Sequence, residues 1–196
     1  MTKRSLFIGP LVGLLLAAPL HSARAEHVRL GGTIALLPIG QLHAEARDTS
    51  LTADTAVAVG FGGLFEVPLL TNVAVGFAPR LLLHVRGEDG EGSGKELDLA
   101  FRLIGNVPVA SAVELYGFAA PGYSIIYVPD WPDGLANPAG FIFGFGAGVG
   151  FDLTSQFRLG VELGYQLGAQ SVSEGGETLD VESSFLHLGV SAMARL

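Results

Sequence analysis

Residues 156–168 alternate strictly between two kinds of side chain. The odd positions carry large apolar residues: Phe157, Leu159, Val161, Leu163, Tyr165 and Leu167. The even positions carry glycine or polar residues: Arg158, Gly160, Glu162, Gly164, Gln166 and Gly168. Successive side chains of a β-strand point to opposite faces, so a period of two predicts a strand with one apolar face.

The same alternation recurs along most of the chain. It is found at residues 141–153, 186–196, 95–107 and 72–86, and less regular versions occupy three further segments: 27–37, 55–67 and 112–127. The sequence therefore predicts eight strands of roughly 10 to 15 residues, whereas strands of soluble sheets usually have about 5 to 6.

The predicted connections alternate in length. Three are short, at residues 68–72, 108–111 and 154–155. Four are long and rich in charged and turn residues, at 38–54, 87–94, 128–139 and 169–180. This order predicts successive hairpins of one antiparallel meander.

The two faces of the strands indicate which solvent each one meets. The chain is 49% hydrophobic and its mean hydropathy is +0.47, yet its 28 glycines disfavour membrane helices. The face opposite the large apolar residues carries glycine, arginine and glutamate, which suits a narrow polar lumen in which glycine leaves room for long side chains from across the barrel. Eight tilted strands of about 11 residues are long enough to cross a bilayer as a closed barrel.

Aromatic residues fall near both ends of the predicted strands. Phe151 and Phe157 flank a short turn, and Tyr123, Tyr127 and Tyr165 lie toward the long connections. These positions predict the two aromatic girdles of a membrane barrel.

The first 25 residues have the layout of a secretory signal peptide. Lys3 and Arg4 precede an apolar run over residues 6–20, and Ala23-Arg24-Ala25 supplies small residues for cleavage after Ala25. The predicted mature chain, residues 26–196, keeps 8 basic and 19 acidic residues.

Composition and motifs exclude several function classes. The absence of cysteine excludes a disulfide scaffold, a zinc ribbon and a thiol enzyme, and the acidic balance argues against nucleic acid as a partner. His187 and Ser191 share a strand face but stand about 13 Å apart, too far for a catalytic hydrogen bond. The stretch beginning at Asp89 is similar to a calcium loop but has Ala100 where glutamate is required. We therefore predict no catalytic, cofactor or metal site.

The segment from Val149 to Tyr165 and the alternation of short and long connections resemble the small eight-stranded outer-membrane proteins, the OmpA-like and OmpX-like barrel superfamily. The resemblance implies an all-β, antiparallel, up-and-down transmembrane barrel over residues 26–196, in the outer membrane of a Gram-negative bacterium. It further implies contact with outer-membrane lipid and lipopolysaccharide, assembly by the barrel-assembly machinery, and a monomer. Such chains commonly end in an aromatic residue, whereas this one ends at Leu196.

Charged residues of both signs occupy the predicted lumen face. The network we predict comprises Arg29, Glu66, Arg80, Arg102, Glu114, Arg158, Glu162 and Arg195, with Arg86, Glu96, Asp98 and Asp152 on the same face. Salt bridges among them would close the interior, because an unpaired charge in a confined lumen is costly. A structural or surface-interaction role follows, with Trp131 either contacting a partner or anchoring the membrane interface. The alternatives are a soluble periplasmic or secreted β-sandwich or barrel that binds an apolar ligand, and a narrow pore.

Overall fold

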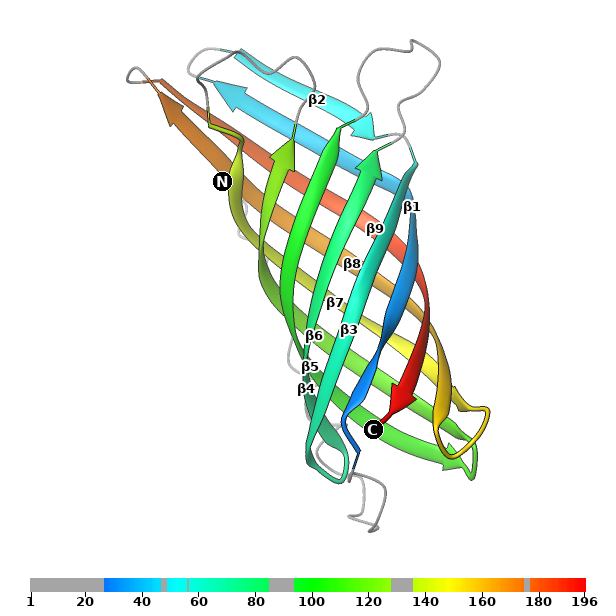
Figure 1. Cartoon of the computed structure of the whole chain (residues 1–196). Coiled ribbons are helices and arrows are strands. Elements are labelled where there is room, and N and C mark those ends of the chain that lie inside the picture. The colour runs from blue at the N-terminus through cyan, green and yellow to red at the C-terminus, as the bar shows by residue number, and fades with distance from the viewer. Residues whose placement is uncertain (1–26, 47–48, 56, 85–93, 128–135, 175–176) are drawn as a thin grey trace, which may run out of the picture.

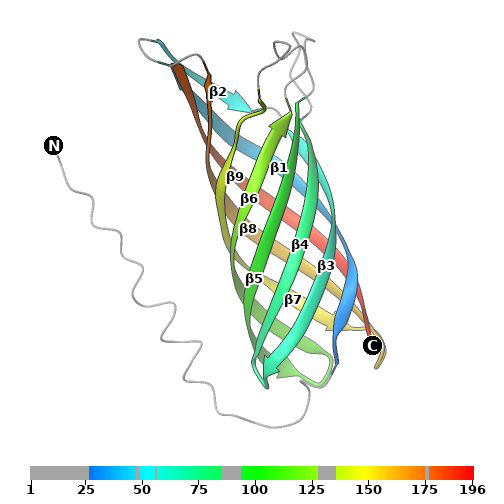
Figure 2. The same cartoon turned by 60° about the vertical axis from the view of Figure 1, so that its left-hand side comes forward.

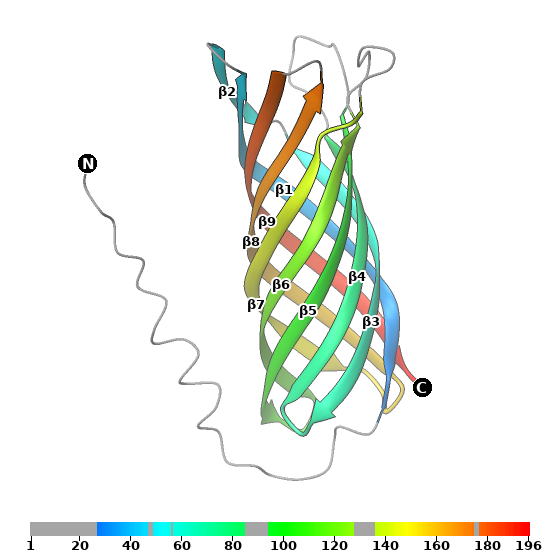
Figure 3. The ribbon, with the colours of Figure 1, turned by 90° about the vertical axis from the view of Figure 1, so that its left-hand side faces the viewer.

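The computed structural model describes residues 27–46, 49–55, 57–84, 94–127, 136–174 and 177–196. Its strands are β1 (Arg29–Ala46), β2 (Thr49–Thr55), β3 (Ala58–Leu70), β4 (Val73–His84), β5 (Lys95–Ala110), β6 (Val113–Tyr127), β7 (Ala139–Asp152), β8 (Phe157–Glu174) and β9 (Glu177–Arg195). All paired strands are antiparallel, and β1 also pairs with β9, so the sheet closes on itself (Figures 1, 2 and 3). One closed sheet is not the two-sheet sandwich of the soluble alternative. No helix long and apolar enough to cross a membrane occurs in the described part of the chain.

The ring has eight strands because β2 and β3 follow one line along β1. Leu37 pairs with Ala58, and three residues farther along both strands Gly40 pairs with Thr55, without any slip in register. The prediction of eight antiparallel strands is therefore confirmed, with the second strand interrupted between Thr55 and Ala58.

Pro38 explains the interruption. It lies between Leu37 and Gly40, where β1 has no described partner on β2 or β3, and its pairing with β9 shifts between Leu36 and Ile39. Proline has no N–H group to donate to a neighbouring strand, so it is accommodated at irregular positions of a sheet.

The short connections fall where they were predicted, but two of the long ones are wrong. Residues 38–54 form the end of β1 and most of β2, and residues 169–180 complete β8 and begin β9. The exposed residues of these segments include Gln41, Glu45, Ser171 and Asp180, so their composition resembles that of loops. Most of the other two predicted connections, 87–94 and 128–139, lies outside the described residues.

The outward face of the ring is an apolar band. Phe101, Phe141 and Leu163 are more than half exposed there, and the predicted aromatics lie at its two ends: Phe151, Phe157, Tyr123, Tyr127 and Tyr165. On β8 the band runs from Phe157 to Leu167, which spans about 33 Å along the strand and about 25 Å along the axis at the usual tilt. That height matches the hydrocarbon-facing band of outer-membrane barrels.

Glycines on the inward face leave space for large side chains of neighbouring strands. A Cβ atom at Gly150 of β7 would overlap the guanidinium of Arg158 on β8, and one at Gly164 of β8 would overlap the ring of His187 on β9. At these positions, the prediction that the space serves side chains from across the barrel is wrong, because each large side chain lies over the strand beside it.

Candidate functional site

The barrel interior holds the predicted charged residues in layers, and the first layer lies at the short-turn end. Arg29 Nη1 on β1 is 3.5 Å from Glu66 Oε2 on β3, and Arg158 Nη2 on β8 is 2.8 Å from Glu114 Oε1 on β6. Arg195 Nη2 forms an ion pair with Asp152 Oδ1. Three arginines therefore face three carboxylates in this layer.

The middle layer centres on Glu162 of β8. Its Oε2 accepts hydrogen bonds from Arg102 Nη2 at 2.9 Å and from the Tyr116 hydroxyl at 3.2 Å, and its Oε1 lies 3.4 Å from His187 Nε2. The Arg102 guanidinium also stands 4.2 Å from the centre of the Phe118 ring, which is the geometry of a cation–π contact.

The third layer joins β4, β5 and β8. Arg80 Nη2 is 2.8 Å from Asp98 Oδ2, and Gln166 donates to the same oxygen at 3.2 Å while accepting from Arg80. Beyond it, the buried Glu96 has its Oε2 3.3 Å from His84 Nε2.

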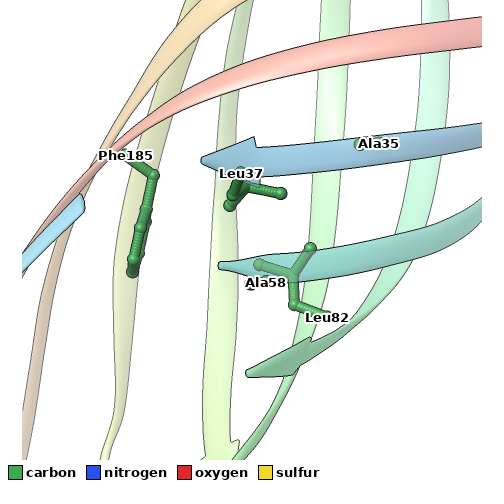
Figure 4. Packing of buried hydrophobic residues seen from close by; sticks show 5 residues of the cluster. All are labelled: Ala35, Leu37, Ala58, Leu82 and Phe185. Atoms are coloured by element: carbon green, nitrogen blue, oxygen red, sulfur yellow. The ribbon is translucent and has the colours of Figure 1, made fainter. Parts of the chain in front are cut away.

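Above these layers lies an apolar cap of five residues, which the sequence analysis missed. Ala35, Leu37, Ala58, Leu82 and Phe185 pack together with at most 3% of any of them exposed, and Leu42 packs against them (Figure 4). The rings of Phe185 and His84 are 5.6 Å apart, so the cap adjoins the last polar pair. The signal was present in Leu81-Leu82-Leu83, because three consecutive residues of a strand cannot all face lipid.

All eight residues of the predicted network lie on the inward face, together with Glu96, Asp98 and Asp152. Sequence reasoning missed Tyr116, Gln166 and His84 as partners of these charges, and treated His187 only as a catalytic candidate. Arg86 and Trp131 lie outside the described residues. Within the described ranges, no group of three or more His, Asp or Glu side chains is placed to hold a metal ion.

Beyond the cap, the outward face of β1, β8 and β9 becomes largely polar. We call residues 39–46, 49–55, 168–174 and 177–184 the flap; it comprises β2 and the ends of β1, β8 and β9 away from the short turns (Figures 1 and 3). Its outward face holds the exposed residues Glu45, Asp180 and Glu182, with Ile39 at the boundary to the ring, and its inward face holds Leu42 and Val181 together with the buried Gln170 and Ser183. The pairing of β8 with β9 keeps one register throughout, so on these two strands the chemistry of the outward face changes without a change in which residues point outward.

Comparison with known proteins agrees with this architecture. Neisserial surface protein A is 16% identical with a TM-score of 0.53, over 84% of this chain and 95% of its own. OprG from Pseudomonas aeruginosa is 12% identical with a TM-score of 0.58, over 88% and 96%. AlkL, determined in DMPC lipid bilayers, is 15% identical with a TM-score of 0.52, over 91% and 96%. At such identities the likeness is one of fold.

The sequence itself assigns the family. No match was found among curated proteins. The family described as outer membrane protein beta-barrel domain matches residues 10–193, which is nearly the whole chain. The protein therefore belongs to this family of Gram-negative outer-membrane β-barrels.

Proposed function

We propose that the protein is an integral outer-membrane barrel with a structural or surface-interaction role, no catalytic activity and an interior closed by paired charges. One observation carries the proposal: all six inward carboxylates of the described strands lie within 4.0 Å of an arginine or histidine nitrogen. An eight-stranded barrel is only wide enough for side chains to fill its interior, so these pairs leave no continuous aqueous path.

The pairs also tie together strands that are not neighbours. Arg102 on β5 reaches Glu162 on β8, Arg158 on β8 reaches Glu114 on β6, and Arg80 on β4 reaches Gln166 on β8. Crosslinks of this kind support a rigid scaffold, on which the function would lie in the residues at the outer end.

Planar bilayer recording tests the closed interior. The purified barrel, folded in detergent, is expected to add no discrete conductance steps to the bilayer. Heating before gel electrophoresis provides the folding control, because a folded outer-membrane barrel migrates differently from the boiled chain. Stable, uniform conductance steps from the heat-modifiable protein would favour the narrow pore instead.

Export and orientation complete the proposal. Residues 1–25 would be removed as a signal peptide after Ala25, and both ends of the barrel chain would lie in the periplasm with the three short turns. The contacts would then be outer-membrane lipid, lipopolysaccharide and the barrel-assembly machinery, and the barrel would be a monomer. The intact mass of the protein extracted from outer membranes tests the cleavage site, because a chain beginning at Glu26 has a unique mass.

Trp131 is the residue we propose for an external contact, on the strength of the prolines on both sides of it in the sequence. The name of Neisserial surface protein A is consistent with a surface role for a barrel of this fold. A Trp131→Ala variant that keeps its heat modifiability is expected to lose binding to cell-surface or matrix partners. Unchanged binding with weaker membrane insertion would identify Trp131 as an interface anchor.

A further inference from the structure

Two adjoining cavities occupy the short-turn half of the barrel interior. The inner one lies among Arg102, Asn106, Arg158, Glu162 and Ser191. The outer one reaches the turn between β3 and β4, where Leu70 and Thr71 line it. Arg29, Glu66 and Asn106 line both cavities, so these side chains form a wall that the two cavities share.

Buried polar atoms beside the inner cavity lack hydrogen-bond partners among the described residues. They are the Oδ1 of Asn106, the Nε of Arg102, and the Nε and Nη1 of Arg158. Asn106 and the two arginines are each at least 93% buried. A buried donor or acceptor without a partner destabilises a fold by about 1 to 3 kcal/mol, so these atoms indicate a bound molecule that supplies the missing hydrogen bonds.

The charges around the cavity identify the class of that molecule. Arg102 is paired with Glu162, Arg158 with Glu114, and Arg29 with Glu66, so an added ion would meet a balanced set. The unpartnered atoms include an acceptor as well as donors, and a neutral molecule that both donates and accepts satisfies them. Each cavity is large enough for a water molecule.

The apolar cap lies beyond these cavities, and the buried polar atoms that adjoin it, such as Glu96 Oε1 and Ser183 Oγ, line neither cavity. The five side chains of the cap are carbon only and almost fully buried, and buried apolar sites of this kind stay dry. Phe118, whose ring stands against the Arg102 guanidinium, and Ile142 are further buried apolar residues.

We propose that the interior is a half-channel: bound water molecules enter from the short-turn end past Thr71, hydrate the cavities between Asn106, Arg158 and Glu162, and stop below the apolar cap. Water and small solutes on the short-turn side thus reach Glu162 and Ser191, whereas the outer side of the membrane does not communicate with them. This one-sided hydration is separate from the proposed closed interior, since it requires no passage through the barrel.

The absence of cysteine from the chain allows a direct test with single thiols. Ser191→Cys places a thiol at the inner cavity, and Ala58→Cys places one in the cap; Ser191 is 3% and Ala58 1% exposed, so burial alone does not distinguish them. The folded variants in detergent are treated with silver ion, which is small and binds thiols. After quenching and unfolding, the thiols that remain are counted with a maleimide.

We expect the Ser191→Cys thiol to be lost at least about tenfold faster than the Ala58→Cys thiol. Equal rates, a faster reaction at Ala58→Cys, or no reaction at Ser191→Cys would overturn the half-channel. Heat modifiability confirms folding, and Ala35→Cys replaces Ala58→Cys as the cap position if the latter does not fold.

The route of access has its own matched pair. Thr71→Trp, added to Ser191→Cys, narrows the outer cavity and is expected to slow the silver reaction about fivefold or more. Ser111→Trp, in the next short turn and outside the lining of both cavities, is expected to leave the rate unchanged. An unchanged rate with Thr71→Trp would show that water does not enter at this end.

Discussion

The membrane ring and the flap share the strands β1, β8 and β9 and differ in the chemistry of their outward faces. In the ring, Leu163 and Val190 point outward and Glu162 and His187 point inward. In the flap, Glu182 points outward, whereas Val181 of the same strand points inward. Since the pairing of β8 with β9 continues without a shift, the difference comes from the sequence and not from the backbone.

The difference teaches that each face of a strand is matched to its own surroundings. Hydrocarbon outside the ring requires apolar side chains there, and the narrow interior tolerates charges because they are paired. Beyond the band, water and head groups favour polar residues on the outside, and apolar residues such as Leu42 and Val181 can then point inward beside the buried Gln170 and Ser183. The apolar cap lies where the second arrangement begins.

The largest effect is expected from breaking the polar interior of the ring. Glu162→Leu removes the carboxylate that accepts from Arg102 and Tyr116, and leaves Arg102 as an unpaired buried charge. We expect it to lower the free energy of unfolding by about 4 kcal/mol, measured by urea titration in lipid vesicles. The control is Glu45→Leu on the exposed face of the flap, where a change within about 0.5 kcal/mol is expected. Similar losses for the two variants would refute the contrast between the interior of the ring and the exposed face of the flap. Adding Arg102→Met to Glu162→Leu removes the unpaired charge and should restore much of the stability.

A charge introduced on the outward face shows where the boundary between ring and flap lies. Val161→Arg places a guanidinium in the middle of the apolar band of β8, and is expected to lower the free energy of unfolding by about 3 kcal/mol. Ser171→Arg lies on the same face of the same strand but in the flap, and should change it by less than about 0.5 kcal/mol. A large loss at Ser171 would mean that the hydrocarbon extends over the flap.

Truncation of the cap tests the apolar inner face. Leu82→Ala removes most of a fully buried side chain and is expected to lower the free energy of unfolding by about 2.5 kcal/mol. Leu82→Met keeps the volume, so its cost should stay below about 1 kcal/mol. If both substitutions proved neutral in urea titrations, Leu82 would not belong to a packed core.

The smallest effect is expected at the rim of the ring. Arg195 pairs with Asp152, also donates to the Ser155 carbonyl at 3.4 Å, and keeps 15% of its side chain exposed. Arg195→Ala should lower the free energy of unfolding by only about 1 kcal/mol, and less in high salt because solvent ions screen a rim pair. The loss at Glu162 should depend less on salt, because its ion pair with Arg102 is more deeply buried than the rim pair. An effect of Arg195→Ala that was larger and independent of salt would show that the rim pair is as well shielded from bulk ions as the Glu162 pair.

The strands of the ring were predictable because hydrocarbon requires an apolar side chain at every second residue. Along 156–168 each side chain meets either hydrocarbon or the interior, so the alternation has no exceptions. On the flap part of β8 the outward residues are small or polar, as in Ser171 and Ser173, and this paired strand therefore has the composition of a loop. Pro38 of β1 also lies beside the interruption between β2 and β3, and alternation alone does not predict such an interruption.

The inward position of the charged residues was predictable, but their partners were not. Arg102 and Glu162 are 60 residues apart and lie on β5 and β8, which are not adjacent in the sheet. Their meeting depends on the stagger of the strands around the ring, which no local pattern encodes. Leu82 and Phe185 were missed because each shares an inward face with charged or polar neighbours such as Arg80 and His187.

The closing pair of strands also has a consequence for assembly. Every neighbouring pair of the sheet is close in sequence except β1 with β9, which joins the two ends of the chain. Before β9 is in place, β1 and β8 each present a row of unpaired backbone groups, and such edges recruit strands of other chains into aggregates. Docking of β9 covers both edges in one step, since it pairs with β8 on one side and with β1 on the other. The last strand of the sheet, β9, is thus the one that covers the edges at which strands of other chains could pair.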